Sequence, residues 1–264
     1  MLTEVKNNIR LVKLSIKYNI IKAMDNRVSF IGQVLGMILN DAIMIVQWVV
    51  LFSLKDNIGG YGFSDVLLLW GIAAGIYGVA HTLFDGAFTI TDLILAGKLD
   101  AFLVQPKNTL LYVTTSKMAV SAFGDLVYAL ILLLVVHPSI TTCLLYILFI
   151  VLGGIICAAF SIILHSLSFY FGSSEDIAHT LNSAMVNFAT YPDGIFDEKT
   201  KILLLTIIPV GWAVYVPMNV LMSFNLGLLI SILLFTLFIT TLAYIIFKNG
   251  LKRYSSSNLM SARI

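Results

Sequence analysis

Five ionisable side chains interrupt long apolar runs, and their type and position make them the residues that could do chemistry: Asp41, His81, Asp85, Asp125 and His165. A charged group at the centre of a membrane-length segment costs about 3 kcal/mol on insertion scales, so such groups are often functional. Asp41 lies near the middle of its run and is the best single candidate for an internal polar contact. For Asp85 and Asp125 we expect structural pairing, because both lie near the ends of their runs.

The sequence carries no motif for catalysis or nucleotide binding. Gly97 and Lys98 are adjacent, but a P-loop would need a glycine five positions earlier and a Ser or Thr after the lysine. The HExxH spacing and the nucleophile elbow are also absent, and the four histidines form no ligand pattern. We therefore assign no catalytic residue, cofactor or metal to this chain, and we expect no enzymatic activity of its own.

Composition predicts an all-α, multi-pass membrane protein. Of 264 residues, 59% are hydrophobic and only 11% are charged, whereas about a quarter of the residues of a soluble domain are charged. The net charge of +2 says little, because the placement of the basic residues carries the information. We expect the chain to lie in the lipid bilayer of a bacterial cell membrane and to have no nucleic-acid partner.

Residues 1–29 are predicted to form an amphipathic helix that lies at the membrane interface. Lys6, Arg10, Lys13 and Lys17 follow one ridge at steps of three and four residues, while isoleucines and a valine occupy the opposite side. Such a helix buries its apolar side in the interface while its lysines reach toward phosphates. A solvated basic helix fits the apolar residues poorly.

Residues 30–264 are predicted to form a transmembrane domain of six helices. About 20 apolar residues suffice to cross a bilayer. Five runs satisfy this requirement, at 30–53, 65–90, 118–136, 143–171 and 226–247.

Two further apolar segments, 177–190 and 202–216, are each only about 15 residues long. Thirteen of the sixteen Lys and Arg residues lie before residue 28, in the loop 91–117 or after residue 247. The tendency of basic loops to stay inside then places both termini in the cytoplasm and makes the number of crossings even.

We therefore assign 177–190 as the fifth crossing and 192–217 as a re-entrant segment that dips in from outside. Backbone of that kind is tolerated only where protein shields it. The fifth crossing is unusually polar, and His179, Asn182 and Asn187 join Asp41 as candidates for the wall of a transport pathway.

The loop 91–117 is the longest moderately polar interruption between spanning runs. Leu95, Leu99, Phe102 and Leu103 recur at helical spacing, and Pro106 ends the pattern. We interpret this as a short cytoplasmic helix, apolar on one side, that docks on a partner. The alternative is a helix that merely lies on the lipid surface.

Three motifs in this order resemble a branch of the ATP-binding-cassette type-two (ABC-2) exporter permeases. The stretch GKLDAFLVQPKN resembles the family's G-x-L-D-x-x-L-x-x-P segment, carried here by Gly97, Leu99, Asp100, Leu103 and Pro106. The pair Tyr191 and Pro192 resembles the tyrosine-proline pair after the fifth helix. The stretch PVGWAVYVP resembles P-x-x-aromatic-x-x-Y-x-P, carried by Pro209, Trp212, Tyr215 and Pro217.

The resemblance implies a permease subunit that pairs with a second permease, identical or related, and with two cytoplasmic ATPase subunits that bind ATP and Mg. Two surfaces would dock on the ATPases. They are the N-terminal helix, with Arg10, Lys13 and Lys17, and the coupling loop, with Lys98, Leu99, Asp100, Phe102, Leu103 and Pro106. The motifs from Tyr191 to Pro217 would form an external gate, and the exported substrates would be amphipathic or hydrophobic, such as peptides or drugs.

Two other functions remain open from the sequence. A secondary carrier or channel would need no ATPase, but inverted repeats and matched broken helices, which would support it, are not apparent. A peptide-binding immunity or sensor protein is the other alternative. An ATPase gene beside this one would favour the exporter over both.

Overall fold

The computed structural model describes residues 2–136 and 138–255, and Arg263, counted above among the basic residues of the tail, lies outside them. Helices make up most of this part of the chain. In order they are α1 (Leu2–Met24), α2 (Arg27–Leu54), α3 (Phe63–Leu83), η1 (Asp85–Thr89), α4 (Ile90–Leu95), α5 (Asp100–Leu103), α6 (Thr109–Thr115), α7 (Ala122–Val135), α8 (Ile140–Ser166), α9 (Ser168–Phe171), α10 (Glu175–Ala189), η2 (Asp193–Ile195), α11 (Glu198–Thr206), η3 (Gly211–Tyr215), α12 (Val216–Met222) and α13 (Leu226–Leu251).

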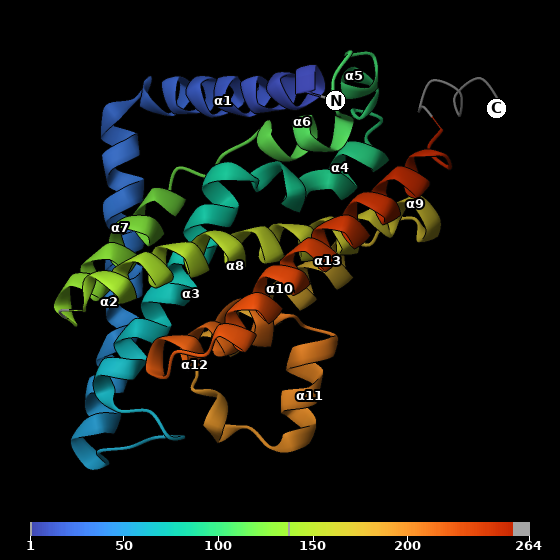
Figure 1. Cartoon of the computed structure of the whole chain (residues 1–264). Coiled ribbons are helices and arrows are strands. Elements are labelled where there is room, and N and C mark those ends of the chain that lie inside the picture. The colour runs from blue at the N-terminus through green and yellow to red at the C-terminus, as the bar shows by residue number, and fades with distance from the viewer. Residues whose placement is uncertain (1, 137, 256–264) are drawn as a thin grey trace.

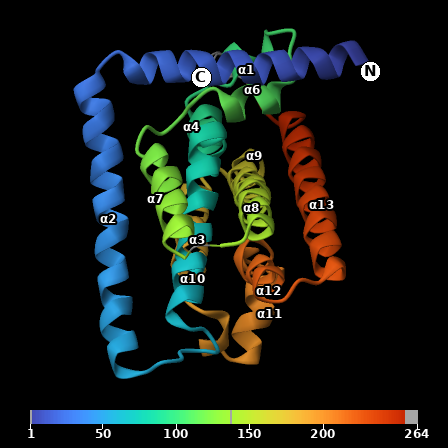
Figure 2. The same ribbon diagram turned by 60° about the vertical axis from the view of Figure 1, so that its left-hand side comes forward.

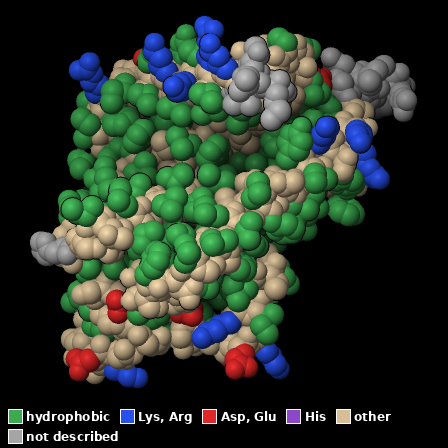
Figure 3. Space-filling model, viewed as in Figure 1, with side chains coloured by type: hydrophobic (Ala, Val, Ile, Leu, Met, Phe, Trp, Pro, Cys, Tyr) green, Lys and Arg blue, Asp and Glu red, His purple; other side chains and the backbone are tan. Residues whose placement is uncertain are grey.

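The helices form a bundle with two distinct ends (Figures 1 and 2). Helix α1 lies across one end, and α5 and α6 lie beside it, so we call this the α1 end. Helix α11 and the loop between α2 and α3 lie at the opposite end, which we call the α11 end. Charged side chains gather at the two ends, and hydrophobic side chains cover the region between them (Figure 3).

Within the described residues, four helical segments are long and apolar enough to cross a membrane. They are α2, α3, the continuous run of α8 and α9 (Ile140–Phe171), and α13. The pair Glu198–Thr206 and Gly211–Met222 would qualify together, but it bends by 90° at the break, as a broken span or a re-entrant loop does. Helices α7 and α10 have 14 and 15 residues, so length and composition support four or five spans, and the count of six stays a prediction.

The core lies around α3, which packs against α7 and α8. In the most apolar part of α3, 83% of residues are buried, compared with 11% in α2 and 22% in α13. Gly153 and Gly154 bring α8 close to α3, since a Cβ at either would lie about 2.5 Å from the side chains of Ile76 or Val79. The outer faces of α2 and α13 are therefore left for lipid or for another protein.

Helices α1 and α2 meet at a sharp corner that contains only Asp25 and Asn26 (Figure 2). The side chain of Asn26 caps α2 by accepting a 3.0 Å hydrogen bond from the backbone N–H of Ser29. Because this cap satisfies an otherwise unpaired N–H group, it fixes where the second helix begins.

Two sequence predictions need correction here. The run predicted at 65–90 ends as a helix at Leu83, and Asp85 starts the separate turn η1, where its Oδ1 lies 2.8 Å from Nδ1 of His81. The single helix predicted in the loop 91–117 is in fact three short helices. Gly97 separates the first two with a positive φ of 66°, a conformation that favours glycine.

Candidate functional site

A cleft with a volume of about 1200 Å³ lies between α1 and the segment 105–116. Asn7, Asn8, Arg10, Ser15 and Asn19 line it from α1, and Gln105, Pro106, Lys107 and Asn108 line it from the loop. We call it the α1 cleft. Arg10 and Pro106, which the sequence analysis assigned to two separate docking surfaces, therefore line the same cleft. Lys13 and Lys17 are exposed but lie outside it.

Helix α1 is held over α6 by one buried side chain and one hydrogen bond. Leu11 is buried, and Nδ2 of Asn19 donates to the backbone carbonyl of Thr115 at 3.1 Å. On the other wall, the side chain of Asn108 caps α6 by accepting from the N–H of Leu111 at 3.1 Å. Both walls of the cleft are thus positioned by defined contacts.

The apolar residues predicted for the coupling helix divide between core and surface. Leu99 is fully buried, and the ring of Phe102 packs edge-on against Tyr112 with centroids 5.0 Å apart. Leu103 and Pro106 are exposed, as is Lys98. Leu103, Pro106 and Lys98 are therefore accessible to a partner, while Leu99 and Phe102 stabilise the loop itself.

Asp100 contacts Tyr254, which lies just after the end of α13. Burial raises the pKa of Tyr254 to about 12, and the hydrogen bond and charge of Asp100 add to this shift. The tyrosine hydroxyl therefore keeps its proton at neutral pH and lies beside the side chain of Asp100. This contact joins α5 to the segment after α13.

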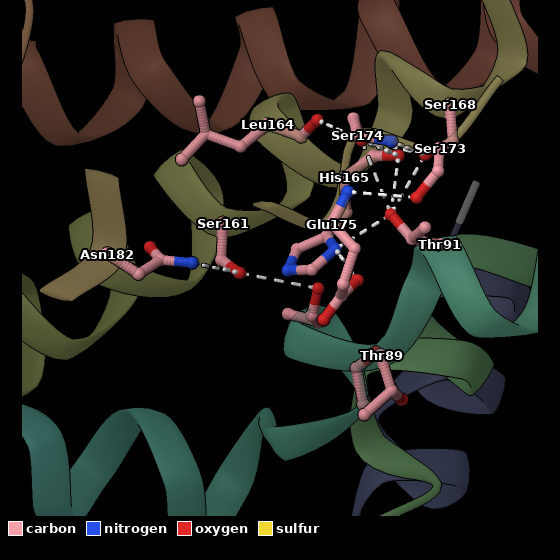
Figure 4. Close-up of polar contacts among 12 residues, drawn as sticks. Thr89, Thr91, Ser161, Leu164, His165, Ser168, Ser173, Ser174, Glu175 and Asn182 are labelled. Carbon is pink, nitrogen blue, oxygen red and sulfur yellow. Dashed lines mark hydrogen bonds and ion pairs between the residues drawn. The ribbon is translucent and has the colours of Figure 1, made fainter. Parts of the chain in front are cut away.

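Five polar side chains meet at the α1 end and form what we call the Thr91 cluster (Figure 4): Thr91, His165, Ser168 and Ser174, which are buried, and Glu175, whose side chain is 43% exposed. The Oγ1 atom of Thr91 lies 2.9 Å from Nδ1 of His165, 2.9 Å from Oγ of Ser168 and 3.3 Å from Oγ of Ser174. Oε2 of Glu175 lies 3.4 Å from the same histidine nitrogen. One threonine on α4 thus connects to α8, to α9 and to the start of α10.

A shorter chain of hydrogen bonds runs beside the Thr91 cluster. Nδ2 of Asn182 donates to Oγ of Ser161 at 3.3 Å, and Ser161 donates to the carbonyl of Ala87 in η1 at 3.4 Å (Figure 4). The predicted pathway residue Asn182 therefore faces α8, and His179 is exposed on α10. Neither lines the cavity that contains the other two pathway candidates, Asp41 and Asn187.

We expect the Thr91→Val variant to be less stable by about 2 kcal/mol, because the near-isosteric valine leaves several buried polar atoms without a partner. Thermal unfolding of the purified protein measures this. The matched control is Thr89→Val, which removes only one long hydrogen bond, 3.4 Å from Oγ1 to the carbonyl of Gly86. Equal melting temperatures for the two variants would contradict the structural role of the cluster.

A cavity of about 650 Å³ opens between α2, α3, α7 and α10. We call it the acidic cavity, because Asp41 and Asp125 line it together with Asn187. Both carboxyl groups are at least nine-tenths buried and lie within hydrogen-bonding reach of each other. Structural pairing was predicted for Asp125, and its neighbour is Asp41, the residue that the sequence places near mid-span.

At the α11 end, the loop between α2 and α3 is bonded to the segment that follows α10. The hydroxyl of Tyr61 donates to Oδ1 of Asp193 at 2.9 Å. Burial, and then the charge of Asp193, raises the pKa of Tyr61 well above its ordinary value, so the donor keeps its proton. Tyr191 packs edge-on against Trp48 with ring centroids 5.8 Å apart, and Pro192 beside it is buried.

The bend between α11 and α12 is built from the residues of the PVGWAVYVP motif. Its π-helical turn, η3, follows Pro209, and Pro217 lies at the start of α12. Nε1 of Trp212 donates to the carbonyl of Leu205 at 3.1 Å, while Tyr215 donates to the carbonyl of Phe188 at 2.6 Å. These bonds tie the bent segment to α11 and to the end of α10.

Thr91, Ser168 and Ser174 were not predicted as site residues. The signal for the two serines was the run of hydroxyl residues beside His165, a histidine predicted only as an ionisable group in an apolar run. Thr91 carries no such signal, because its role depends on a contact 74 residues away.

Comparison with known proteins agrees with this architecture. No curated protein and no solved structure matches the chain. A family model described as "ABC-2 family transporter protein" matches residues 38–258, which includes the predicted coupling loop and the bent segment. The match spans most of the 264 residues and confirms the resemblance stated from the motifs, so this chain is a multi-pass membrane protein that belongs to the ABC-2 transporter family.

Proposed function

We propose that this chain is the permease subunit of an ATP-driven exporter in a bacterial cell membrane. The observation that carries the proposal is the α1 cleft, where α1 and the loop after α3 meet as one polar, accessible surface at the basic end of the bundle. ATP and Mg would be bound by separate ATPase subunits that dock on this surface.

The proposed topology has six crossings, formed by α2, α3, α7, α8, α10 and α13. Both termini and the α1 end then face the cytoplasm, and the α11 end faces outside. The run of helices back and forth between the two ends supports this arrangement (Figure 2). The segment from η2 to α12 enters from the outside and returns, and its contacts with Phe188 and Phe235 supply the protein shield that such backbone needs.

The proposed coupling route runs from the α1 cleft through the Thr91 cluster to α10. Movement of the coupling loop would be passed through Thr91 to the start of α10, because their hydroxyl and imidazole groups are directly bonded. Helix α10 also contributes Asn187 to the acidic cavity, so the route ends at a pathway wall. A substrate must prefer one of the two access states for transport to be coupled in this way.

The permease would act as a dimer with a second copy or a related chain, and the largely exposed apolar face of α2 leaves room for such a partner. The substrate would be amphipathic or hydrophobic, such as a peptide or a drug. The contacts at the α11 end would close the pathway toward the outside between transport events.

Charge reversal on α1 tests the docking proposal. We expect Arg10→Glu to weaken association with a co-expressed ABC ATPase subunit from the same genome by about tenfold, because Arg10 lines the cleft. Lys22→Glu reverses the same charge on the same helix, at an exposed position outside the cleft, and should leave association unchanged. Co-purification and ATP turnover of the reconstituted complex measure both.

Equal association of the two variants would contradict docking at the α1 cleft. Transport by the purified chain in the absence of any ATPase would instead favour the carrier or channel. Binding of a peptide without any movement of it would favour the immunity protein.

A further inference from the structure

We infer that the acidic cavity recognises a monovalent organic cation, so that the transported substrate is an amphipathic molecule with an ammonium, guanidinium or phosphonium centre. This inference rests on the proposed function and deepens it by naming the chemistry of the substrate. Its first support is an unsatisfied acid at the cavity wall.

Asp41 is 8% exposed and lines the cavity. Nδ2 of Asn40 donates to Oδ1 at 3.5 Å, but no described residue donates to Oδ2. The neighbouring polar group is the carboxyl of Asp125, which can donate only if it is protonated. The pair thus holds either a shared proton or an excess of negative charge.

Two adjacent carboxylates repel each other, and burial in an apolar segment makes either charge costly. A cation placed beside them removes both penalties, whereas a neutral molecule removes neither. Electrostatics therefore favours positively charged ligands over neutral ones of the same shape.

The other walls fit an organic ion better than a metal ion. Trp70, Tyr77 and Tyr191 present aromatic rings to the cavity, and Met37 and Met44 present flexible apolar side chains. Aromatic faces attract cations, and methionine adapts to ligands of different shape. The indole N–H of Trp70 is buried and has no acceptor among the described residues, so this wall holds a second unsatisfied polar atom, which an acceptor atom on the body of the ligand would satisfy.

The size of the cavity points the same way. About 650 Å³ lies within the range of roughly 300–1,000 Å³ typical of drug-sized ligands. Calcium and magnesium need about six or more close oxygen ligands, usually with several carboxylates among them, and within the described residues no three His, Cys, Asp or Glu side chains come together to hold a metal ion. The negative pair then fixes the charged centre while the rest of the cavity contacts the apolar body.

The test measures binding of radiolabelled methyltriphenylphosphonium to the purified full chain in lipid nanodiscs without ATPase or nucleotide. We expect it to bind more tightly than triphenylphosphine oxide, a neutral analogue of similar shape. Asp41→Asn should weaken phosphonium binding by about tenfold and leave oxide binding unchanged, since it removes charge but little volume. Asp56→Asn, which removes an exposed charge in the loop between α2 and α3, should leave both unchanged.

Ala74→Phe provides a second, steric variant, because Ala74 lines the cavity and both acids remain. It should weaken binding of both compounds. Equal affinity of the wild type for the two compounds would overturn the inference even if no variant folds. Equal phosphonium binding by the wild type and Asp41→Asn would also overturn it. So would displacement of the labelled phosphonium by millimolar Mg²⁺ or Ca²⁺ but not by an excess of the unlabelled phosphonium.

Because no nucleotide is present, this result is independent of the ATPase. Cation binding with no ATPase association would leave this inference standing and remove the exporter proposal. ATPase association at the α1 cleft without cation selectivity would leave the exporter proposal standing and remove this inference.

Discussion

The Gly86→Ala variant is expected to lose about 3 kcal/mol of stability and about 10 °C in melting temperature. A Cβ at this position would lie 2.0 Å from the backbone carbonyl oxygen of Val113 and 3.0 Å from that of Thr114. Backbone atoms cannot move aside as a flexible side chain can, so α6 itself must shift. The same helix supplies the carbonyl of Thr115 that holds Asn19 of α1, so the α1 cleft should lose one wall.

Thermal unfolding with size-exclusion chromatography of the purified protein measures the effect. The matched control is Gly36→Ala in α2, where a Cβ meets no atom within 4 Å and where alanine favours the helix. An unchanged melting temperature in Gly86→Ala would mean that η1 and α6 do not pack as closely as described.

The second large effect is expected at the α11 end, where Gly194→Ala should separate two loops. A Cβ on Gly194 would lie 1.9 Å from the carbonyl oxygen of Gly59, which is itself backbone. The hydrogen bond from Tyr61 to Asp193 and the 3.9 Å ion pair of Lys201 with Asp193 depend on that contact. We expect trypsin to cleave after Lys201 several-fold faster in the variant.

Site-resolved mass spectrometry of the digest distinguishes this cleavage from cleavage in the basic segments at the other end. Gly32→Ala serves as the control, since its Cβ would meet no atom within 4 Å. Equal cleavage rates after Lys201 in the two variants would contradict the proposed closure of this end.

The long apolar helices could be predicted from sequence because hydrophobicity over about 20 residues is a local property. The runs at 30–53 and 226–247 agree with α2 and α13 to within a few residues. The run at 65–90 was extended too far because Ala87 and Ile90 are apolar. They are buried against α8 at the α1 end rather than forming part of α3.

The surroundings of helices with intermediate polarity were harder to predict from the sequence. Residues 175–189 form a helix, as the assignment of a crossing at 177–190 requires, but the polar side chains on it face different surroundings. Asn187 lines the acidic cavity, Asn182 bonds to α8 and His179 is exposed. Helical spacing alone does not state which face meets which neighbour.

The sites could be predicted only in part, because they are made by contacts between distant segments. Asp41 was selected from its position at mid-span, but Asp125 becomes its partner only when α7 packs against α2. Arg10 and Pro106 were assigned to docking surfaces separately, and a shared cleft between them depends on how α1 folds back over α6.

The corner between α1 and α2 has a mechanical consequence. With only Asp25 and Asn26 between them, the two helices form an L-shaped lever whose pivot is the capped start of α2. Asp41 lies about 21 Å along the long arm at 1.5 Å per residue, so a tilt of about 10° would swing it sideways by about 4 Å. A push on α1 would thereby widen or narrow the space around the buried acids, without any helix having to unwind.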